Sequence, residues 1–371
     1  MAPLARFFTV WRTVTARDRE IIDAVVQPEH RGPSPEFAAA LKEWPGSHYW
    51  AHGDGVGRMV LIRSIAPSPK ERWWLHILLF SVSFLTVWMG GALLSGADVA
   101  GPVSLRDIPN FGSQFIHWVL QLRVDVGLDF AVALMGILLA HEMGHYVAAK
   151  RYTINASPPF FLPAPPFLNV IGTFGAFIRL RSPVVDRRQL MDVGAAGPWL
   201  GFVVALFVLL IGLQRSDVIN EVGPTQLVVA FGQYRIYLGD SLITQWARLW
   251  LVGEGTVVLH PLAQAGWFGV LVTMLNLLPL GQLDGGHVLY ALVRERQKLV
   301  GILVWLSLIV LGFGFPFWWL WAGFTLLLGS GRIGHPTVLD RHRALPRSRF
   351  PLGWATVLLF VVTFMPVPFA L

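Results

Sequence analysis

The chain contains no cysteine. Disulfide bonds and thiolate metal sites are therefore excluded, and any metal ion must be held by nitrogen and oxygen ligands. Charged residues are also scarce, at 14% of the 371 residues, whereas 54% are hydrophobic and the mean hydropathy is +0.56. A soluble globular protein has about 25% charged residues. This composition indicates an integral membrane protein that crosses the bilayer several times.

Apolar runs recur along the chain after residue 72, and most approach the length of about 20 helical residues that crosses the hydrocarbon of a bilayer. They cover residues 73–94, 127–149, 193–213, 264–290, 299–313, 315–330 and 352–370. We expect an all-α fold with about seven transmembrane helices. The count can change by one, because the fifth and sixth runs are short and share the break GFGFP. The first run begins too late for a signal peptide.

The distribution of lysine and arginine predicts the orientation in the membrane. Basic residues concentrate in segments 1–72, 150–190, 291–298 and 331–350, whereas 95–126 and 214–263 have at least as many acids. The positive-inside rule then places the N-terminus in the cytosol and the C-terminus outside. The net charge of +7 follows this topology, so no nucleic-acid partner is expected. The excess of arginine over lysine favours a bacterial inner (cytoplasmic) membrane, with a plastid membrane as the alternative.

Three segments do not read as simple spans. Residues 1–72 are polar and of mixed charge, and predict a small cytosolic region containing a short strand, RMVLIRSI, which leaves residues 73–371 as the membrane-embedded domain. Residues 157–178, SPPFFLPAPPFLNVIGTFGAFI, are apolar but rich in proline, which favours an extended or re-entrant β-hairpin over a helix. Within the fourth run, Pro279, Gly281, Gly285 and Gly286 should break the helix.

The second run contains HEMGH. Its four-residue spacing places His141 and His145 on one side of a helix, so that both imidazoles can bind one metal ion. Glu142 can act as general base toward a water molecule on that metal. A pair of hydrogen bonds between helices is the alternative, but it leaves Glu142 in hydrocarbon without a purpose.

A catalytic zinc site usually has three protein ligands, and Asp284 in LDGGH is the candidate for the third. His141 and Asp284 lie nine and ten residues before a basic segment, so both should lie about 13 to 15 Å from that membrane boundary. Asp284 can instead accept amide hydrogen bonds from its glycine-rich turn. His287 is the rival ligand, although a supporting or interfacial position suits it better.

Asn276 is a polar amide in the same apolar run as Asp284. It can donate to a developing oxyanion or form a hydrogen bond between helices. Other histidines, among them His76, His117, His260 and His335, lack partners at metal spacing, and we expect them to be interfacial or structural.

Four motifs together resemble those of the site-2 protease family of intramembrane zinc metalloproteases. They are HEMGH, GTFGAFI at 172–178, DVGAAGPWLG at 192–201 and NLLPLGQLDGGH at 276–287. The stretch HPLAQAGWFG before the last motif and the later GRIGHP are most similar to the branch of plastid and bacterial members without an inserted PDZ domain. The resemblance covers about residues 73–350, with a catalytic core in 127–213 and 264–290.

The resemblance implies a role for each matched residue. Zinc would be bound by His141, His145 and Asp284, Glu142 would be the general base, and Asn276 would steady the oxyanion. The hairpin residues Gly172, Thr173, Phe174 and Gly175 would pair with an unwound substrate as an added strand. The implied activity is hydrolysis of a peptide bond in or near the transmembrane segment of single-pass membrane proteins, known as regulated intramembrane proteolysis.

Two other functions are compatible with a membrane protein that carries these residues. A metal transporter would place its histidines and aspartates at several depths along a path, and would not need a glutamate directly after a ligand. A catalytically inactive relative would only bind membrane proteins, but here His141, Glu142, His145 and Asp284 are all intact. The oligomeric state is left open.

Overall fold

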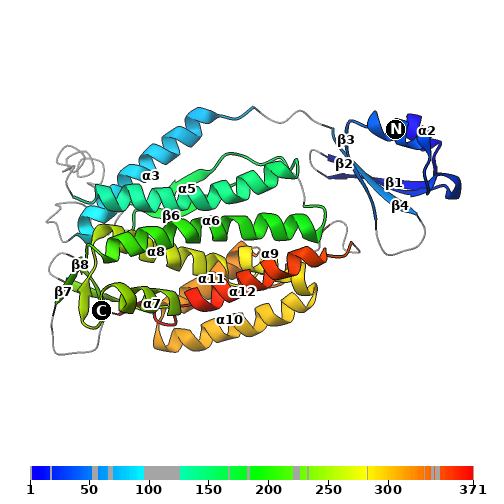
Figure 1. Ribbon diagram of the computed structural model, residues 1–371. Coiled ribbons are helices and arrows are strands. Elements are labelled where there is room, and N and C mark those ends of the chain that lie inside the picture. The colour runs from blue at the N-terminus through cyan, green and yellow to red at the C-terminus, as the bar shows by residue number, and fades with distance from the viewer. Residues whose placement is uncertain are drawn as a thin grey trace.

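The larger part of the molecule is a bundle of apolar helices (Figure 1). The computed structural model describes residues 2–16, 19–51, 57–65, 70–95, 126–165, 168–181, 184–219, 226–231, 234–281, 283–329, 331–335, 338 and 343–370. The helices of the bundle are α3 (Trp73–Leu94), α5 (Leu128–Arg151), α6 (Arg187–Leu213), α7 (Leu242–Leu251), α8 (Pro261–Asn276), α9 (Asp284–Val293), α10 (Arg296–Gly314), α11 (Phe317–Leu328) and α12 (Phe350–Thr363).

Four helices within the described part of the chain, α3, α5, α6 and α10, are long and apolar enough to cross a membrane. This finding supports an integral membrane protein. Each of the seven predicted runs contains helix, but the fourth consists of α8 and α9 on either side of a break, as Pro279 and Gly281 predicted. The prediction that Gly285 and Gly286 also break the helix is wrong, because both lie in the first turn of α9, where the lack of a side chain lets the helix pack on the backbone of residues 277–281. Helices α11 and α12 have 12 and 14 residues, short of the roughly 20 that a span needs. The count of seven spans therefore stays a prediction.

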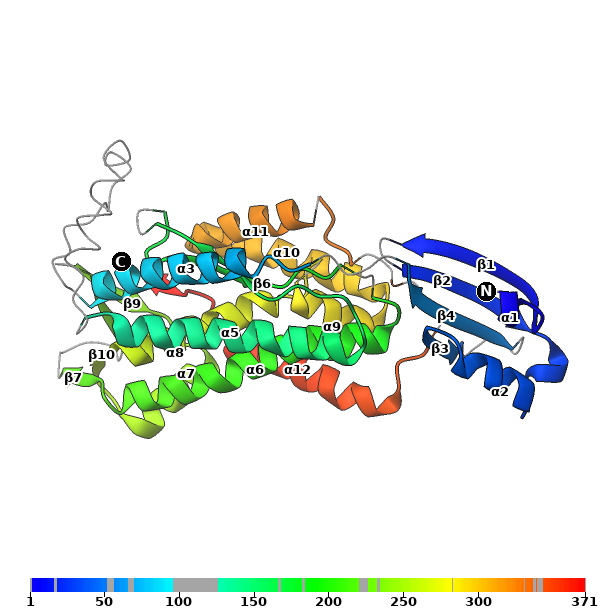
Figure 2. The ribbon, with the colours of Figure 1, turned by 90° about the horizontal axis from the view of Figure 1, so that it is seen from above.

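The centre of the bundle is formed by α5, α6 and α8, which pack on one another, while α3 lies against α5 (Figure 2). Helix α9 packs on α6, and α10 and α12 pack on α9. We call the end at which α3 and α6 begin and α5 ends the basic end, because Lys150, Arg151 and Arg187 lie there.

A four-stranded antiparallel sheet lies beyond the basic end, in the order β1-β2-β4-β3. Its elements are α1 (Ala2–Ala5), β1 (Phe8–Ala16), β2 (Arg19–Val26), a 3-10 turn (Pro28–His30), α2 (Pro35–Lys42), β3 (Gly46–Trp50) and β4 (Arg58–Ser64). Strand β4 confirms the predicted strand. One face of the sheet buries its own core, which includes Phe7, Phe8 and Met59. On the other face Val60 and Ile62 cluster with Val185, just before α6.

A second sheet lies at the opposite end of the bundle, in the order β11-β9-β8-β10-β7. Its strands are β7 (Asp217–Ile219), β8 (Leu227–Phe231), β9 (Tyr234–Leu238), β10 (Thr256–Val258) and β11 (Phe369–Ala370). These strands are not predicted from the sequence, because strands of two to five residues are too short to show an alternating pattern. The all-α expectation therefore holds for the bundle but not for its two ends.

The predicted β-hairpin is present and consists of β5 (Phe160–Pro163) and β6 (Thr173–Phe177), which pair antiparallel. Strand β5 packs on α3, and β6 contacts both α3 and α5. The backbone of Gly172, at φ +88°, lies so close to α3 that a Cβ would overlap the carbonyl group of Thr86. The Thr173 hydroxyl donates to the carbonyl of Leu162 at 2.8 Å, which holds the two strands together.

The base of the hairpin is tied to the start of α3 by polar contacts. Arg181, which follows β6, forms a bidentate ion pair with Glu71, just before α3. The hydrogen bond from Arg181 holds the pKa of Glu71 below its ordinary value of 4.5. His76 Nδ1 lies 3.0 Å from the carbonyl oxygen of Pro159, and its ring packs on that of Phe160. These contacts attach the hairpin to α3.

The Glu71→Gln variant tests this tie. Because the folded pKa of Glu71 lies below 4.5, the ion pair stabilises the protein above that pH, and its contribution is lost as the pH falls through the folded pKa. We expect the variant to lose about 0.5–1 kcal/mol at neutral pH, and the difference from wild type in thermal unfolding midpoint to shrink below pH 4.5. Glu36→Gln, at an exposed carboxylate on α2, is the control and should show no such trend. A difference for Glu71→Gln that does not change with pH would contradict the assignment.

Candidate metal centre

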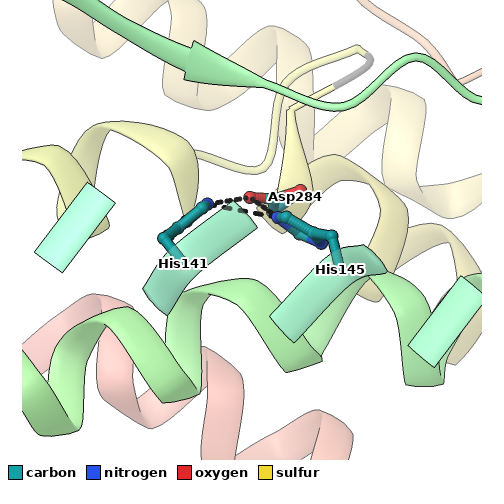
Figure 3. A group of neighbouring side chains, drawn as sticks. All are labelled: His141, His145 and Asp284. Carbon is teal, nitrogen blue, oxygen red and sulfur yellow. Dashed lines mark hydrogen bonds and ion pairs between the residues drawn. The ribbon is translucent and has the colours of Figure 1, made fainter. Parts of the chain in front are cut away.

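Three side chains converge in the middle of the bundle (Figure 3). His141 and His145 lie one turn apart on α5, and Asp284 is the first residue of α9. The two Nε2 atoms are 3.1 Å apart, and Asp284 Oδ2 lies 3.4 Å from His141 Nε2 and 3.2 Å from His145 Nε2. Both histidines are buried, and the Asp284 side chain is 15% exposed. We call these three residues the metal trio.

The spacing of the trio fits a tetrahedral zinc ion. Zinc bonds of about 2.0–2.1 Å at tetrahedral angles place ligand atoms about 3.3 Å apart. The three observed separations of 3.1, 3.2 and 3.4 Å therefore match the edges of one face of such a tetrahedron. Two imidazole nitrogens and a carboxylate oxygen are also donors that zinc accepts, and three protein ligands leave one position for water or substrate.

Helix α6 orients the second histidine. His145 Nδ1 lies 2.8 Å from the backbone carbonyl oxygen of Val193. Because a carbonyl only accepts, Nδ1 carries the proton, and the lone pair on Nε2 faces the other two members of the trio. At Gly197 a Cβ would overlap the His145 ring, and at Gly201 it would stand 2.9 Å from His141 Cβ. The glycines of DVGAAGPWLG thus let α6 pass close enough to hold both imidazoles.

The turn between α8 and α9 positions Asp284 at the start of α9. Hydrogen bonds from later parts of the chain hold this turn, and the sequence alone did not connect those parts with the site. The Gly281 amide donates to the carbonyl of Ile333 at 2.8 Å. The buried Gln297 donates to the carbonyl of Pro279 and accepts from the amide of His335, both at 2.9 Å. The only sequence signals for this arrangement were the motif GRIGHP and a glutamine at the start of an apolar helix.

His287, the rival ligand, pairs with His335 instead. His335 Nε2 lies 2.7 Å from His287 Nδ1, and the His335 ring stacks on Tyr290 with centroids 4.7 Å apart. Among the described residues, the metal trio is the one group of three or more His, Asp or Glu residues whose potential donor atoms all lie within 4.8 Å of one another. The geometry therefore favours Asp284 over His287 as the third donor.

Glu142 and Asn276 line the same cavity as the trio, whose volume is about 510 Å³. Glu142 is buried, and Ile178, just after β6, lines the cavity with it. Asn276 is the last residue of α8, and its Nδ2 lies 3.5 Å from His141 Nε2. A candidate base and a candidate oxyanion donor thus lie beside the donor atoms, although their catalytic roles stay predictions.

The four hairpin residues predicted to bind substrate lie in different surroundings. Gly172 packs on α3 and Thr173 is buried inside the hairpin, whereas Phe174 is exposed and Gly175 has open space beside it. The cavity is lined instead by the residues that follow them, 176–178. Pairing with a substrate through residues 172–175 stays a prediction.

The remaining histidines named in the sequence analysis have no place in the metal trio. His76 contacts the base of the hairpin, and His260 caps α8 by accepting from the amide of Leu262 at 3.2 Å. His117 lies outside the described residues. His335 supports the turn before Asp284, so it is a structural residue close to the site.

Gly197→Ala should abolish zinc binding, because its methyl group would occupy the place of the His145 ring. We expect less than a tenth of the wild-type zinc content after purification, measured by elemental analysis. Gly136→Ala is the matched control on α5, where a Cβ would meet no atom within 4 Å, and it should keep full zinc. Thermal unfolding in excess chelator checks that both variants are folded. Wild-type zinc content in a folded Gly197→Ala protein would contradict the close packing of α6 on His145.

Comparison with known proteins agrees with this geometry. Residues 129–311 match Peptidase family M50. The chain is 31% identical over 279 residues to "Probable zinc metalloprotease EGY2, chloroplastic" of Arabidopsis thaliana. The aligned region covers 72% of this chain and 47% of the relative. It is 30% identical over 249 residues to "Probable zinc metalloprotease EGY1, chloroplastic" of the same plant, covering 66% of this chain and 44% of the relative.

The chain thus spans less than half the length of these curated relatives. No solved structure matches it. The matched region contains His141, Glu142, His145, Asn276 and Asp284, so the family match and the metal trio concern the same part of the molecule. The chain therefore contains a domain of Peptidase family M50, the site-2 protease family of zinc metalloproteases, and is homologous to the plant zinc metalloproteases.

Proposed function

We propose that this chain is a zinc endopeptidase that hydrolyses a peptide bond in or near the transmembrane segment of single-pass membrane proteins. The observation that carries the proposal is the placing of Glu142 and Asn276 in one cavity with three donor atoms at zinc spacing. Family membership supports the metalloprotease chemistry. The class of substrate is inferred from the position of the site inside a bundle of membrane helices.

The residues around the trio have distinct tasks in this hydrolysis. When bound, zinc supplies a Lewis acid that polarises the scissile carbonyl and makes water a better nucleophile at neutral pH. Glu142 takes the proton from the attacking water and passes it to the leaving amine. The buried Glu142 lies in the wall of the cavity that also holds the metal trio. Asn276 Nδ2 donates to the oxyanion that develops on the scissile carbonyl.

The hairpin gives the substrate a place to bind in extended form. Within the described residues β6 pairs only with β5, so its other edge is available to an added strand. A substrate strand on that edge would run past Phe177 and Ile178, which line the cavity beside Glu142. A transmembrane helix hides its carbonyls in internal hydrogen bonds, so the substrate must unwind locally before it can be cut.

The depth of the site supports release of the product at the basic end. His141 lies ten residues before the end of α5, and Asp284 nine before the end of α9, so both lie about 14 to 15 Å from the basic end. By the positive-inside rule we assign this end to the cytosol, from which water reaches the site. The plant relatives are chloroplastic by name, and give no support to the bacterial inner membrane expected from the arginine excess.

A metal transporter is the less favoured function. It would need further donor groups at other depths along a path, but the described residues contain one such group, the metal trio. Transport also gives no task to the buried Glu142 or to a β-hairpin beside the cavity. An inactive relative would share the geometry, so only a cleavage assay separates it from the enzyme.

Replacing Glu142 by glutamine keeps the shape of the side chain but removes the base. In membranes that contain a panel of single-pass substrates, we expect Glu142→Gln to lower the cleavage rate by about 10²–10⁴-fold with zinc content unchanged. Asp284→Ala should lose both zinc and cleavage. Equal cleavage by wild type and Glu142→Gln would contradict the mechanism, and full zinc in Asp284→Ala would transfer the third ligand to His287. Wild type that binds zinc but cleaves no substrate would identify an inactive relative.

A further inference from the structure

Helix α7 presents an apolar face outward. Leu242, Trp246, Leu249 and Trp250 fall on one side of this ten-residue helix, and the two tryptophans are 52% and 64% exposed. Their indole rings stack with centroids 5.3 Å apart. No other described element covers this face, although the helix lies in a segment whose composition suggested an aqueous loop.

The inward face of α7 carries paired polar groups beside apolar ones such as the fully buried Ala247. Thr244 and Arg248 are buried, and both bond to the carboxylate of Asp240: Arg248 at 3.0 and 3.2 Å, and Thr244 at 3.0 Å. A helix on a water-exposed surface turns charged and polar residues outward, whereas α7 turns leucine and tryptophan side chains outward. Polar groups that pair inside while apolar groups face outward are typical of a helix surrounded by lipid.

The neighbours of α7 place it beside the candidate span α6. The helix packs on α6 and α12, and Ile243 clusters with Phe202 and Leu359 on those helices. Phe202 lies 15 residues after Arg187, or about 22 Å along α6 from the basic end. After α7 the chain enters β10, which pairs with β7 just beyond the far end of α6. Helix α7 therefore runs from the middle of the bundle to the end at which the second sheet lies, in agreement with Figure 1.

We propose that α7 is a half-spanning helix whose outward face contacts lipid acyl chains in the leaflet opposite the basic end. Ten residues span about 15 Å, half of the roughly 30 Å hydrocarbon thickness. The face continues the exposed apolar surface of its neighbours, which includes Phe207 on the candidate span α6 and Leu358 on α12. Tryptophan is the residue that favours the boundary between hydrocarbon and headgroups, which suits Trp250 near the sheet end.

The absence of cysteine makes a site-directed spin-labelling experiment direct, because no native thiol must be removed. Full-length protein with Leu242→Cys, Trp246→Cys or Trp250→Cys is nitroxide-labelled and reconstituted into phosphatidylcholine vesicles. Relaxation by oxygen, which concentrates in lipid, is compared with relaxation by a water-soluble nickel chelate. Phe207→Cys is the matched lipid-facing control on α6, and Asp217→Cys is the exposed control on β7.

We expect the α7 labels to resemble Phe207→Cys, with oxygen accessibility several times that of nickel, and the label at 242 to lie deeper than that at 250. Nickel accessibility equal to that of Asp217→Cys would place α7 in water and overturn the proposal. Protection from both reagents with broadening between labels would identify a second copy of the chain as the occupant, and would overturn it too. None of these outcomes depends on catalytic activity, so the experiment tests the lipid contact of α7 separately from the proposed protease function.

Discussion

The contact between α5 and α6 at Gly197 is the constraint on which the site depends. Because a Cβ at Gly197 would overlap the ring of His145, the helices can approach closely only with glycine there. That approach brings the Val193 carbonyl to 2.8 Å from His145 Nδ1, which sets the tautomer and turns Nε2 toward the other donors. The orientation of the zinc-binding side chains therefore depends on the close packing of α5 and α6.

A site inside a membrane must satisfy its polar groups from within the protein, since lipid offers no hydrogen bonds. The turn before Asp284 shows how this is done: its carbonyl at Pro279 and its amide at Gly281 bond to Gln297 and to Ile333. The same requirement explains the Asp240–Arg248 pair behind α7. Segments far apart in sequence are thus joined by polar contacts at the points where helix geometry is interrupted.

The sequence predicted what depends on local periodicity. The four-residue spacing of His141 and His145 was enough to predict that they lie together on one side of a helix. The distances of His141 and Asp284 from the basic segments were enough to predict that both lie at the same depth in the bundle. Prolines around β5 predicted the hairpin. The contacts of Gln297 and His335 could not be predicted, because they join residues 18 and 38 positions apart through single hydrogen bonds. The second sheet was missed because its strands of two to five residues are too short to show an alternating pattern, and because β11 joins β9 from more than 100 residues away.

Two imidazoles and one carboxylate are positioned to hold zinc in a tetrahedral site. X-ray absorption at the zinc edge of the purified full-length protein can measure this coordination. We expect about four nitrogen or oxygen neighbours at roughly 2.0–2.1 Å, with multiple scattering from two imidazole rings. Scattering from three imidazole rings would mean that a third histidine binds zinc in place of Asp284. A six-coordinate shell without imidazole would contradict the proposed zinc site altogether.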